Sequence, residues 1–232
     1  MKKIFGLIVT LMMISANCFA MTFSQPVKIG GIGFPTQSPY HYYLVDGATF
    51  NNGKSYTENP KFADKRTTYK EGTAVFGNGN DALYCQYSYS VPSANSDDWR
   101  HSFKFGGKNN YIISIESQYK KIYKIDSNEG LTIYSIVRIS GSEQINIIGR
   151  QKDGKWVSYI NTEILTNKFF GGKQAYKAAA GVHYETPEVQ NDTIIIPYDF
   201  SSVSGRSITT KGEFRFKWDD KAQWFGIEQI IY

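Results

Sequence analysis

Residues 213–231 read EFRFKWDDKAQWFGIEQII, and this stretch decides the fold. Over residues 213–218 three aromatic side chains alternate with three charged ones, so an extended chain here has one apolar and one charged face. Residues 219–222 are two aspartates, a lysine and an alanine, a polar sequence that favours a turn, and a second apolar run follows over residues 223–231. The sequence therefore predicts two antiparallel strands joined by a tight turn.

Short apolar runs of the same kind, rich in Tyr, Phe, Ile, Val and Thr and broken by Gly, Asn and Asp, extend along most of the chain. They predict a meander with strands at residues 110–117, 119–126, 131–139, 143–151 and 155–160, and with turns at 126–130, 141–142 and 153–154. Turn residues also predict hairpin connections at 45–48 and 76–81, and the polar residues 51–71 predict a long loop.

One short helix is expected near residues 162–169. Asn161 is placed to cap it, Glu163 lies where the helix dipole favours a negative charge, and two glycines follow its end. Residues 173–181 fit either a helix or a strand. The sequence thus predicts an all-β domain, an antiparallel β-sandwich or open barrel built from meander hairpins, with this one helix.

Acidic turns followed by aromatic or aliphatic strands occur around residues 126–134, 152–159 and 218–225. The intervals between them differ, whereas propeller blades and solenoids repeat at a fixed period. We therefore interpret these segments as one kind of hairpin turn used several times, and not as a sequence repeat.

Residues 1–20, MKKIFGLIVTLMMISANCFA, predict a secretory signal peptide. Two lysines begin it, an apolar run too short to span a bilayer follows, and small residues come last. The mature chain then starts near Met21, forms a single domain over residues 21–232, carries no transmembrane segment, and is exported to the periplasm, the cell surface or the medium. An uncleaved anchor, a buried first helix and lipidation at Cys18 are the alternatives, and Asn17 disfavours lipidation because lipoprotein signals prefer a small residue there.

The charge of the chain is nearly balanced. It has 26 Lys and Arg against 21 Asp and Glu, and loss of the leader with its two lysines leaves 24 against 21, a net charge of +3. A nucleic-acid-binding protein usually has a stronger and more clustered positive charge, so we expect no nucleic-acid partner. The most basic run is KKIYK at residues 120–124, for which we expect a strand with solvated lysines, with a polyanion or membrane-surface patch as the alternative.

Cys85 is the only cysteine left after loss of the leader, so no intramolecular disulfide can form. In an extended chain it shares a face with Leu83, Tyr87 and Tyr89. We therefore expect a buried, inert thiol, since a nucleophilic thiol would need a neighbouring histidine or cation.

Several short motifs resemble functional sites but lack the context that those sites need. Residues 77–82 match G-x-G-x-x-A, yet the following residues are strand-like, and prolines follow the glycine-rich residues 30–33, so we interpret both as turns. Residues 126–130 open like a calcium loop, but Val137 stands where the bidentate carboxylate belongs. The three histidines are not spaced like metal ligands, and no G-x-S-x-G elbow occurs. We expect no catalytic residue, no metal site and no cofactor.

Aromatic residues are abundant, with 17 tyrosines and 4 tryptophans spread over both faces of the expected strands. A sandwich can bury one set of rings and display the other, and displayed rings suit stacking on sugars or anchoring a protein partner. Filling a core without disulfides is the alternative use of these rings. The candidate ligand-binding residues are Tyr40, Tyr42, Trp99, Trp156 and Trp224.

We therefore expect an exported, non-catalytic binding protein whose ligand is a glycan or a protein partner. One alternative is a secreted polysaccharide hydrolase with two carboxylates among Asp97, Asp98, Glu185 and Glu188. Another is a structural or assembly component of the envelope, which would use an exposed strand edge such as residues 230–232.

Overall fold

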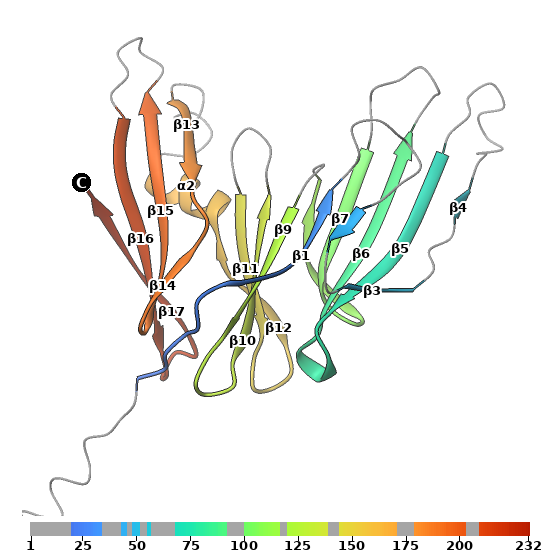
Figure 1. Cartoon of the computed structure of the whole chain (residues 1–232). Coiled ribbons are helices and arrows are strands. Elements are labelled where there is room, and N and C mark those ends of the chain that lie inside the picture. The colour runs from blue at the N-terminus through green and yellow to red at the C-terminus, as the bar shows by residue number, and fades with distance from the viewer. Residues whose placement is uncertain are drawn as a thin grey trace, which may run out of the picture.

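Three antiparallel sheets make up the fold (Figure 1). The structure, a computed structural model, describes residues 20–33, 43–45, 48–51, 55–56, 68–91, 100–116, 120–138, 144–170, 179–202 and 209–232. Of the predicted signal peptide only Ala20 is described, so that assignment stays a prediction. None of the helices in the described ranges has the length and apolar character needed to span a membrane.

The central sheet has six strands in the order β12-β11-β10-β9-β1-β2. They are β1 (Val27–Gly33), β2 (Tyr43–Val45), β9 (Lys120–Asp126), β10 (Thr132–Arg138), β11 (Gln144–Arg150) and β12 (Trp156–Asn161). Consecutive strands β9 to β12 pair with their neighbours, which confirms four of the five strands of the predicted meander, and each of their boundaries falls within about one residue of the prediction. The remaining predicted strand, at residues 110–117, forms in another sheet and does not pair with β9, so its place in the meander is wrong.

The β5–β8 sheet has the order β3-β5-β6-β7-β8, with β4 pairing to β5. Its strands are β3 (Ala48–Asn51), β4 (Ser55–Tyr56), β5 (Thr68–Phe76), β6 (Leu83–Val91), β7 (Arg100–Gly107) and β8 (Asn110–Ile115). A three-residue 3-10 helix, η1 (Gly79–Asp81), lies in the connection between β5 and β6. This confirms the predicted hairpin at residues 76–81, and the glycine-rich residues 77–82 form its turn.

The C-terminal sheet has the order β13-β15-β16-β17, with β14 pairing to β15. Its strands are β13 (Ala179–Tyr184), β14 (Glu188–Gln190), β15 (Thr193–Ser202), β16 (Thr209–Asp219) and β17 (Trp224–Ile231). The β16–β17 pairing confirms the predicted hairpin, with Trp218 opposite Phe225. For residues 173–181, the described part from residue 179 is strand, as the alternating pattern indicated.

The helix α2 (Thr162–Phe169) has the predicted bounds and the predicted cap. The Asn161 Oδ1 atom accepts hydrogen bonds from the backbone N–H groups of Glu163 at 2.9 Å and Ile164 at 3.3 Å. Leu165 is the apolar residue of α2 that enters the core, next to the C-terminal sheet.

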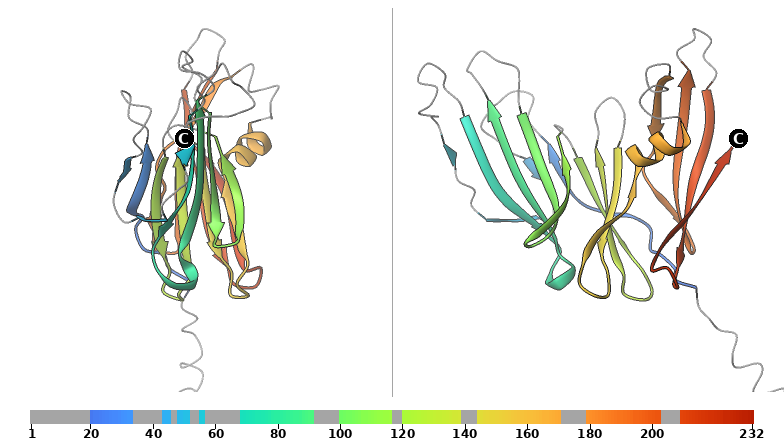
Figure 2. Two further views of the ribbon diagram at one scale, coloured as in Figure 1. Left: turned by 90° about the vertical axis from the view of Figure 1, so that its right-hand side faces the viewer. Right: turned by 180° about the vertical axis from the view of Figure 1, so that it is seen from behind.

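The central sheet is covered on both faces, so the sandwich has three layers (Figure 2). On β10, Ile133 and Val137 join a core shared with the C-terminal sheet, whereas Tyr134 and Ile136 join a core shared with the β5–β8 sheet. Alternate side chains of one strand point to opposite faces, which explains this division. None of the three sheets closes into a barrel, and their stacking is that of the predicted all-β sandwich.

Three local predictions are wrong. Residues 45–48 do not join a hairpin, because β2 pairs with β1 and β3 pairs with β5. Residues 30–33 are strand and not a turn, since β1 pairs with β9 across a register shift between Lys28 and Gly30. The long loop expected over residues 51–71 is interrupted by β4 and by the start of β5. The partner of β1 that local patterns do not reveal is β9, which lies far along the chain, whereas β2 and β4 pair with strands next to them in sequence across longer connections than a tight turn.

The lysine run departs from expectation, whereas the cysteine does not. Lys120 is 0% exposed, and its Nζ atom lies 3.7 Å from the centroid of the Phe103 ring, so the prediction of solvated lysines is wrong at this position. The chain folds so that the start of β9 is covered by the β5–β8 sheet. Cys85 is buried, and burial raises the pKa of its thiol, as expected for an inert side chain. Leu83 and Tyr87 are buried beside it, while the Tyr89 side chain lies outside the described residues.

Candidate functional site: a cavity at the turn end

Hairpin turns from all three sheets gather at one end of the sandwich, the lower end in Figure 1. A cavity of about 160 Å³, which we name the turn-end cavity, lies among them. Asp81 lines it from the β5–β8 sheet, Arg150 and Tyr159 from the central sheet, and Trp218 and Gln223 from the C-terminal sheet. The cavity therefore exists only because three sheets, each with its own turn, meet at this point.

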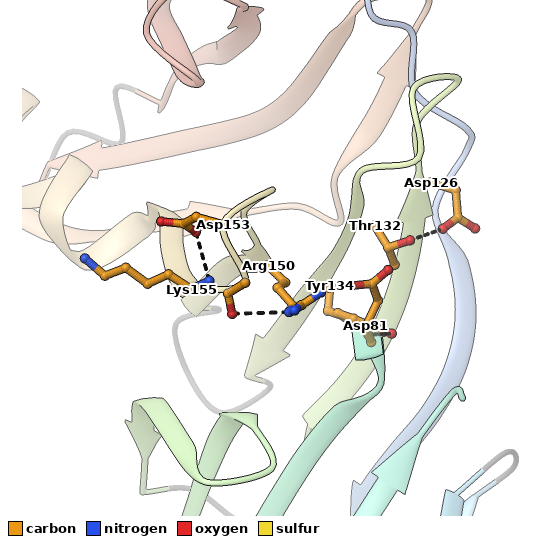
Figure 3. A network of polar contacts seen from close by, with 8 residues as sticks. Asp81, Asp126, Thr132, Tyr134, Arg150, Asp153 and Lys155 are labelled. Atoms are coloured by element: carbon orange, nitrogen blue, oxygen red, sulfur yellow. Dashed lines mark hydrogen bonds and ion pairs between the residues drawn. The ribbon is translucent and has the colours of Figure 1, made fainter. Parts of the chain in front are cut away.

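Arg150 links two of the sheets at the rim of the cavity (Figure 3). Its Nε atom donates to the carbonyl oxygen of Gly154 at 3.2 Å, and its Nη1 atom lies 3.4 Å from Asp81 Oδ1. The Arg150 and Asp81 side chains are 31% and 49% exposed, so this ion pair adds little stability. The ion pair instead fixes the positions of the two charged groups, because it holds the Arg150 guanidinium and the Asp81 carboxylate side by side where a ligand could reach both.

A hydrogen bond from Tyr134 on β10 fixes the backbone position of Asp81. The Tyr134 hydroxyl donates to the Asp81 carbonyl oxygen at 2.6 Å, so η1 is tied to the central sheet (Figure 3). Burial raises the pKa of Tyr134 to about 12, and the charges of Asp126 and Asp81 add to this effect. The phenol therefore remains protonated and remains a donor throughout the physiological pH range.

Tyr159 supplies an unsatisfied polar group. The residue is only 7% exposed and lines the cavity, and its hydroxyl oxygen is buried without a hydrogen-bond partner among the described residues. Burial, and then the charge of Asp153, raises the pKa of Tyr159 to about 12, so the group is a neutral donor. Buried polar atoms without partners are rare in native proteins, and this one therefore requires an explanation.

Tyr159 and Trp218 line the cavity and belong to an aromatic cluster that also contains Trp224 and Phe225. The Tyr159 ring lies 4.9 Å from that of Trp224, 5.6 Å from that of Trp218 and 5.5 Å from that of Phe225, measured between centroids. Phe225 is buried, Trp218 is half-buried, and Trp224 is 37% exposed. The cluster thus runs from the core to the surface and presents the Trp224 ring to solvent beside the cavity.

The turn between β16 and β17 orients these tryptophans. The Asp219 Oδ1 atom accepts hydrogen bonds from the backbone N–H groups of Lys221 at 2.8 Å and Ala222 at 3.0 Å. The Trp218 indole N–H donates to Asp220 Oδ1 at 3.0 Å, and Gln223 has a φ of 51°, in the left-handed region. An Asp-based turn of this kind needs no glycine, and it brings both indoles to the same end of the hairpin.

The site combines flat apolar surface with groups of both hydrogen-bonding types. The Trp218 ring offers an apolar face within the cavity, and the Trp224 ring offers a second one next to Tyr159; Arg150 and Asp81 offer a cationic donor and an anionic acceptor, and the neutral Tyr159 hydroxyl is buried. Such a combination suits a neutral ligand with many hydroxyl groups and apolar C–H faces. In the part of the chain that is described, no group of three His, Cys, Asp or Glu side chains could hold a metal ion.

Of the five residues predicted to bind a ligand, Trp224 does not line the cavity, but its ring lies 4.9 Å from that of Tyr159, which does. Trp156 is 6% exposed and packs in the core, its ring 6.1 Å from that of Tyr134, so it offers a ligand almost no surface. The other three, Tyr40, Tyr42 and Trp99, lie outside the described residues.

The predicted carboxylates do not line the turn-end cavity where they are described. Glu185 precedes β14 and Glu188 begins it, and both are exposed. Asp97 and Asp98 lie outside the described residues. The carboxylates that do line the cavity are Asp81 and Glu129, each on a hairpin connection.

Sequence patterns missed Arg150, Tyr159 and Asp81. Each occupies an ordinary place in the sequence, at a strand end, within a strand and in a turn, and nothing in its neighbours marks it. The one available signal was that acidic turns recur next to aromatic strands. This pattern predicted the hairpin turns but not that turns of three sheets would form a cavity. Comparison of the chain with protein-family models, with curated proteins and with solved structures found no match.

Proposed function

We propose that this chain is an exported protein that binds a glycan, without converting it, in the turn-end cavity. The observation that carries the proposal is the cavity itself, which Tyr159 and Trp218 line and next to which the exposed Trp224 ring packs on Tyr159; the buried Tyr159 hydroxyl has no partner among the described residues. The predicted signal peptide agrees with such a role, because it would deliver the chain to a compartment where glycans are exposed.

Burying the Tyr159 hydroxyl without a partner costs about 1–3 kcal/mol relative to a satisfied group. A phenylalanine would fill the same space without that cost, so the hydroxyl disfavours folding unless something else uses it. The hydroxyl oxygen is closed to solvent, so in this proposal a small movement of the Tyr159 side chain on binding opens it to the cavity, where a sugar hydroxyl accepts from the phenol and recovers the lost hydrogen bond. Tyr159 is thereby explained as a binding group and not as a packing group.

The aromatic cluster supports a sugar more than a charged metabolite. Sugar rings have apolar C–H faces that pack on indoles, and their hydroxyl rims need both donors and acceptors. Trp224 supplies the face, and Arg150, Asp81 and Gln223 supply the polar rim. The cavity of about 160 Å³ is small, so we expect it to hold one sugar unit of a longer chain whose remainder lies over Trp224.

The test begins with residues 21–232 and a panel of soluble oligosaccharides that includes cell-wall fragments. A sugar that binds the folded state raises the melting temperature and changes the Trp fluorescence. Trp224→Ala should then weaken binding of the active oligosaccharide at least roughly tenfold, as expected for loss of one aromatic anchor. Ile164→Ala is the control, because Ile164 is 64% exposed on α2 and belongs to none of the walls of the cavity.

Two other outcomes point to the alternatives. Asp81 and Glu129 both line the cavity, so release of new reducing ends from the bound oligosaccharide would replace simple binding with hydrolysis. Absence of any thermal shift across the panel would contradict the glycan proposal and favour a protein partner. Equal affinity of the wild-type protein and Trp224→Ala would place the glycan somewhere other than this cavity.

A further inference from the structure

Strand β17 differs from every other edge strand among the described residues. The edge strands β2, β3, β4 and β14 have between two and four residues each. The longer edges β8, β12 and β13 each pair with their neighbour across a register shift. β17 has eight residues and pairs with β16 in an unbroken register, and within the described chain it has no partner on its other side. Short length and bulges are the devices that protect edges from pairing, and β17 has neither.

The side chains of β17 are unprotected as well. The strand contains no lysine and no proline, and Glu228 is its only charged residue. Six large hydrophobic residues are exposed in the described part of the chain, and four of them lie at this edge: Trp224, Ile227, Ile231 and Tyr232. Ile227 is 38% exposed and Ile231 is 62% exposed, and the two-residue period of a strand places both on one face. An open edge with this composition is a template for another strand.

We propose that β17 pairs with β17 of a second copy of this chain, antiparallel and centred on Gln229. In that register Ile227 lies opposite Ile231 of the second copy, and the same contact occurs a second time through the two-fold axis. Glu228 lies opposite Ile230 of the second copy, and within its own chain it lies opposite Arg215. A register centred on Glu228 would instead place two carboxylates opposite each other, which is unfavourable. Apolar contact and charge therefore select the same register.

The pairing joins two C-terminal sheets into one continuous sheet and leaves the turn-end cavity open. Trp224 is the first residue of β17, five residues from the Gln229 centre of the pairing, and it lies outside residues 227–231, whose contacts define the register. Dimerisation and glycan binding are therefore independent, and either can fail without the other.

The first test measures the mass of residues 21–232 by sedimentation over a series of concentrations. We expect a dimer that dissociates on dilution, and Ile227→Lys should weaken it by more than roughly tenfold, because two lysines would then enter the shared edge. Ile164→Lys is the control, because Ile164 is also exposed, at 64% against 38% for Ile227, but lies on α2, and this change should leave the dimer unchanged. A wild-type chain that stays monomeric at all concentrations overturns the proposal, as does equal weakening by both variants.

The second test reads the register by disulfide cross-linking. In the proposed dimer the two Gln229 residues face each other at a Cα separation of about 4.5–5.5 Å, within the range that a disulfide spans. Gln229→Cys should therefore form a covalent dimer under mild oxidation. Ile231→Cys should not, because its two copies are offset by four residues, about 13 Å, and the native Cys85 is buried and does not compete. Ile231 is more exposed than Gln229, so exposure alone would make Ile231→Cys the faster variant to cross-link. Faster cross-linking of Ile231→Cys than of Gln229→Cys would therefore contradict the register.

Discussion

Replacing Lys120 by methionine should remove a pH dependence of stability that this single residue causes. Lys120 is fully buried between the central sheet and the β5–β8 sheet, with its Nζ atom over the Phe103 ring. Burial lowers the pKa of Lys120 to about 7; the nearby Cys85 opposes this change and Arg138 adds to it. Methionine keeps an unbranched side chain in the same space but cannot bind a proton.

The direction in which the free energy of unfolding changes with pH follows from proton linkage. Between the folded-state pKa of about 7 and the ordinary value of 10.5, the unfolded chain holds a proton on Lys120 that the folded chain has released. Unfolding therefore takes up a proton, and the free energy of unfolding rises with pH by up to about 1.4 kcal/mol per pH unit. Because the folded lysine is still half protonated near its pKa, the rise from about pH 7 to about pH 9 sums to about 2 kcal/mol.

The assay is urea unfolding followed by Trp fluorescence at several pH values between these limits. The difference between the free energies of unfolding of Lys120→Met and the wild type should shift by about 2 kcal/mol over this range, in the direction that favours the wild type at high pH. Lys121→Met is the control, since the neighbouring side chain points to the other face of β9 and is half-buried. Parallel pH curves for the wild type and Lys120→Met would refute the reasoning.

Three further predictions concern the fold. Asn161→Ala should lower the free energy of unfolding by about 1–2 kcal/mol through loss of the cap on α2, measured by urea unfolding, whereas Asn167→Ala on the exposed side of the same helix should not. Gly107→Ala should cost about 1–3 kcal/mol, because its Cβ atom would lie 2.5 Å from Trp156 Cδ1, and Gly226→Ala, which meets only ordinary contacts, should cost less. The Cys85 thiol should react with a thiol reagent only on unfolding, because it is 0% exposed and burial raises its pKa; modification of the folded protein at the unfolded rate would contradict its placement.

Local sequence patterns were sufficient to predict the helix and the hairpins, because these elements depend on residues that are close together along the chain. The Asn161 cap and the glycines that follow the helix defined α2, and the acidic turns defined the hairpins β9–β10, β11–β12 and β16–β17. These features follow from hydrogen bonds that reach only a few residues along the chain, so alternation and turn chemistry reveal them.

The rest depends on which strands meet, and that is set by packing between distant segments. The pairing of β1 with β9 makes the expected turn at residues 30–33 part of a strand, and the pairing of β3 with β5 places the two sides of the expected hairpin at residues 45–48 in different sheets. Lys120 resembles the lysines around it, and only the β5–β8 sheet that covers it makes it a buried residue. The turn-end cavity has the same origin, because Asp81, Tyr159 and Trp218 come from three different sheets.

The most direct test of the glycan proposal compares Tyr159→Phe with Tyr184→Phe by titration calorimetry with the oligosaccharide found in the thermal screen. Tyr159 lines the cavity and has a buried hydroxyl without a partner among the described residues, whereas Tyr184 does not line the cavity and its hydroxyl lies 2.8 Å from Thr166 Oγ1. We predict that Tyr159→Phe loses about 1 kcal/mol of binding free energy, roughly fivefold in affinity, with unchanged or higher stability, and that Tyr184→Phe loses stability but binds as the wild type does. Unchanged affinity in Tyr159→Phe, or the same loss in both variants, would contradict the proposal that this hydroxyl serves a ligand.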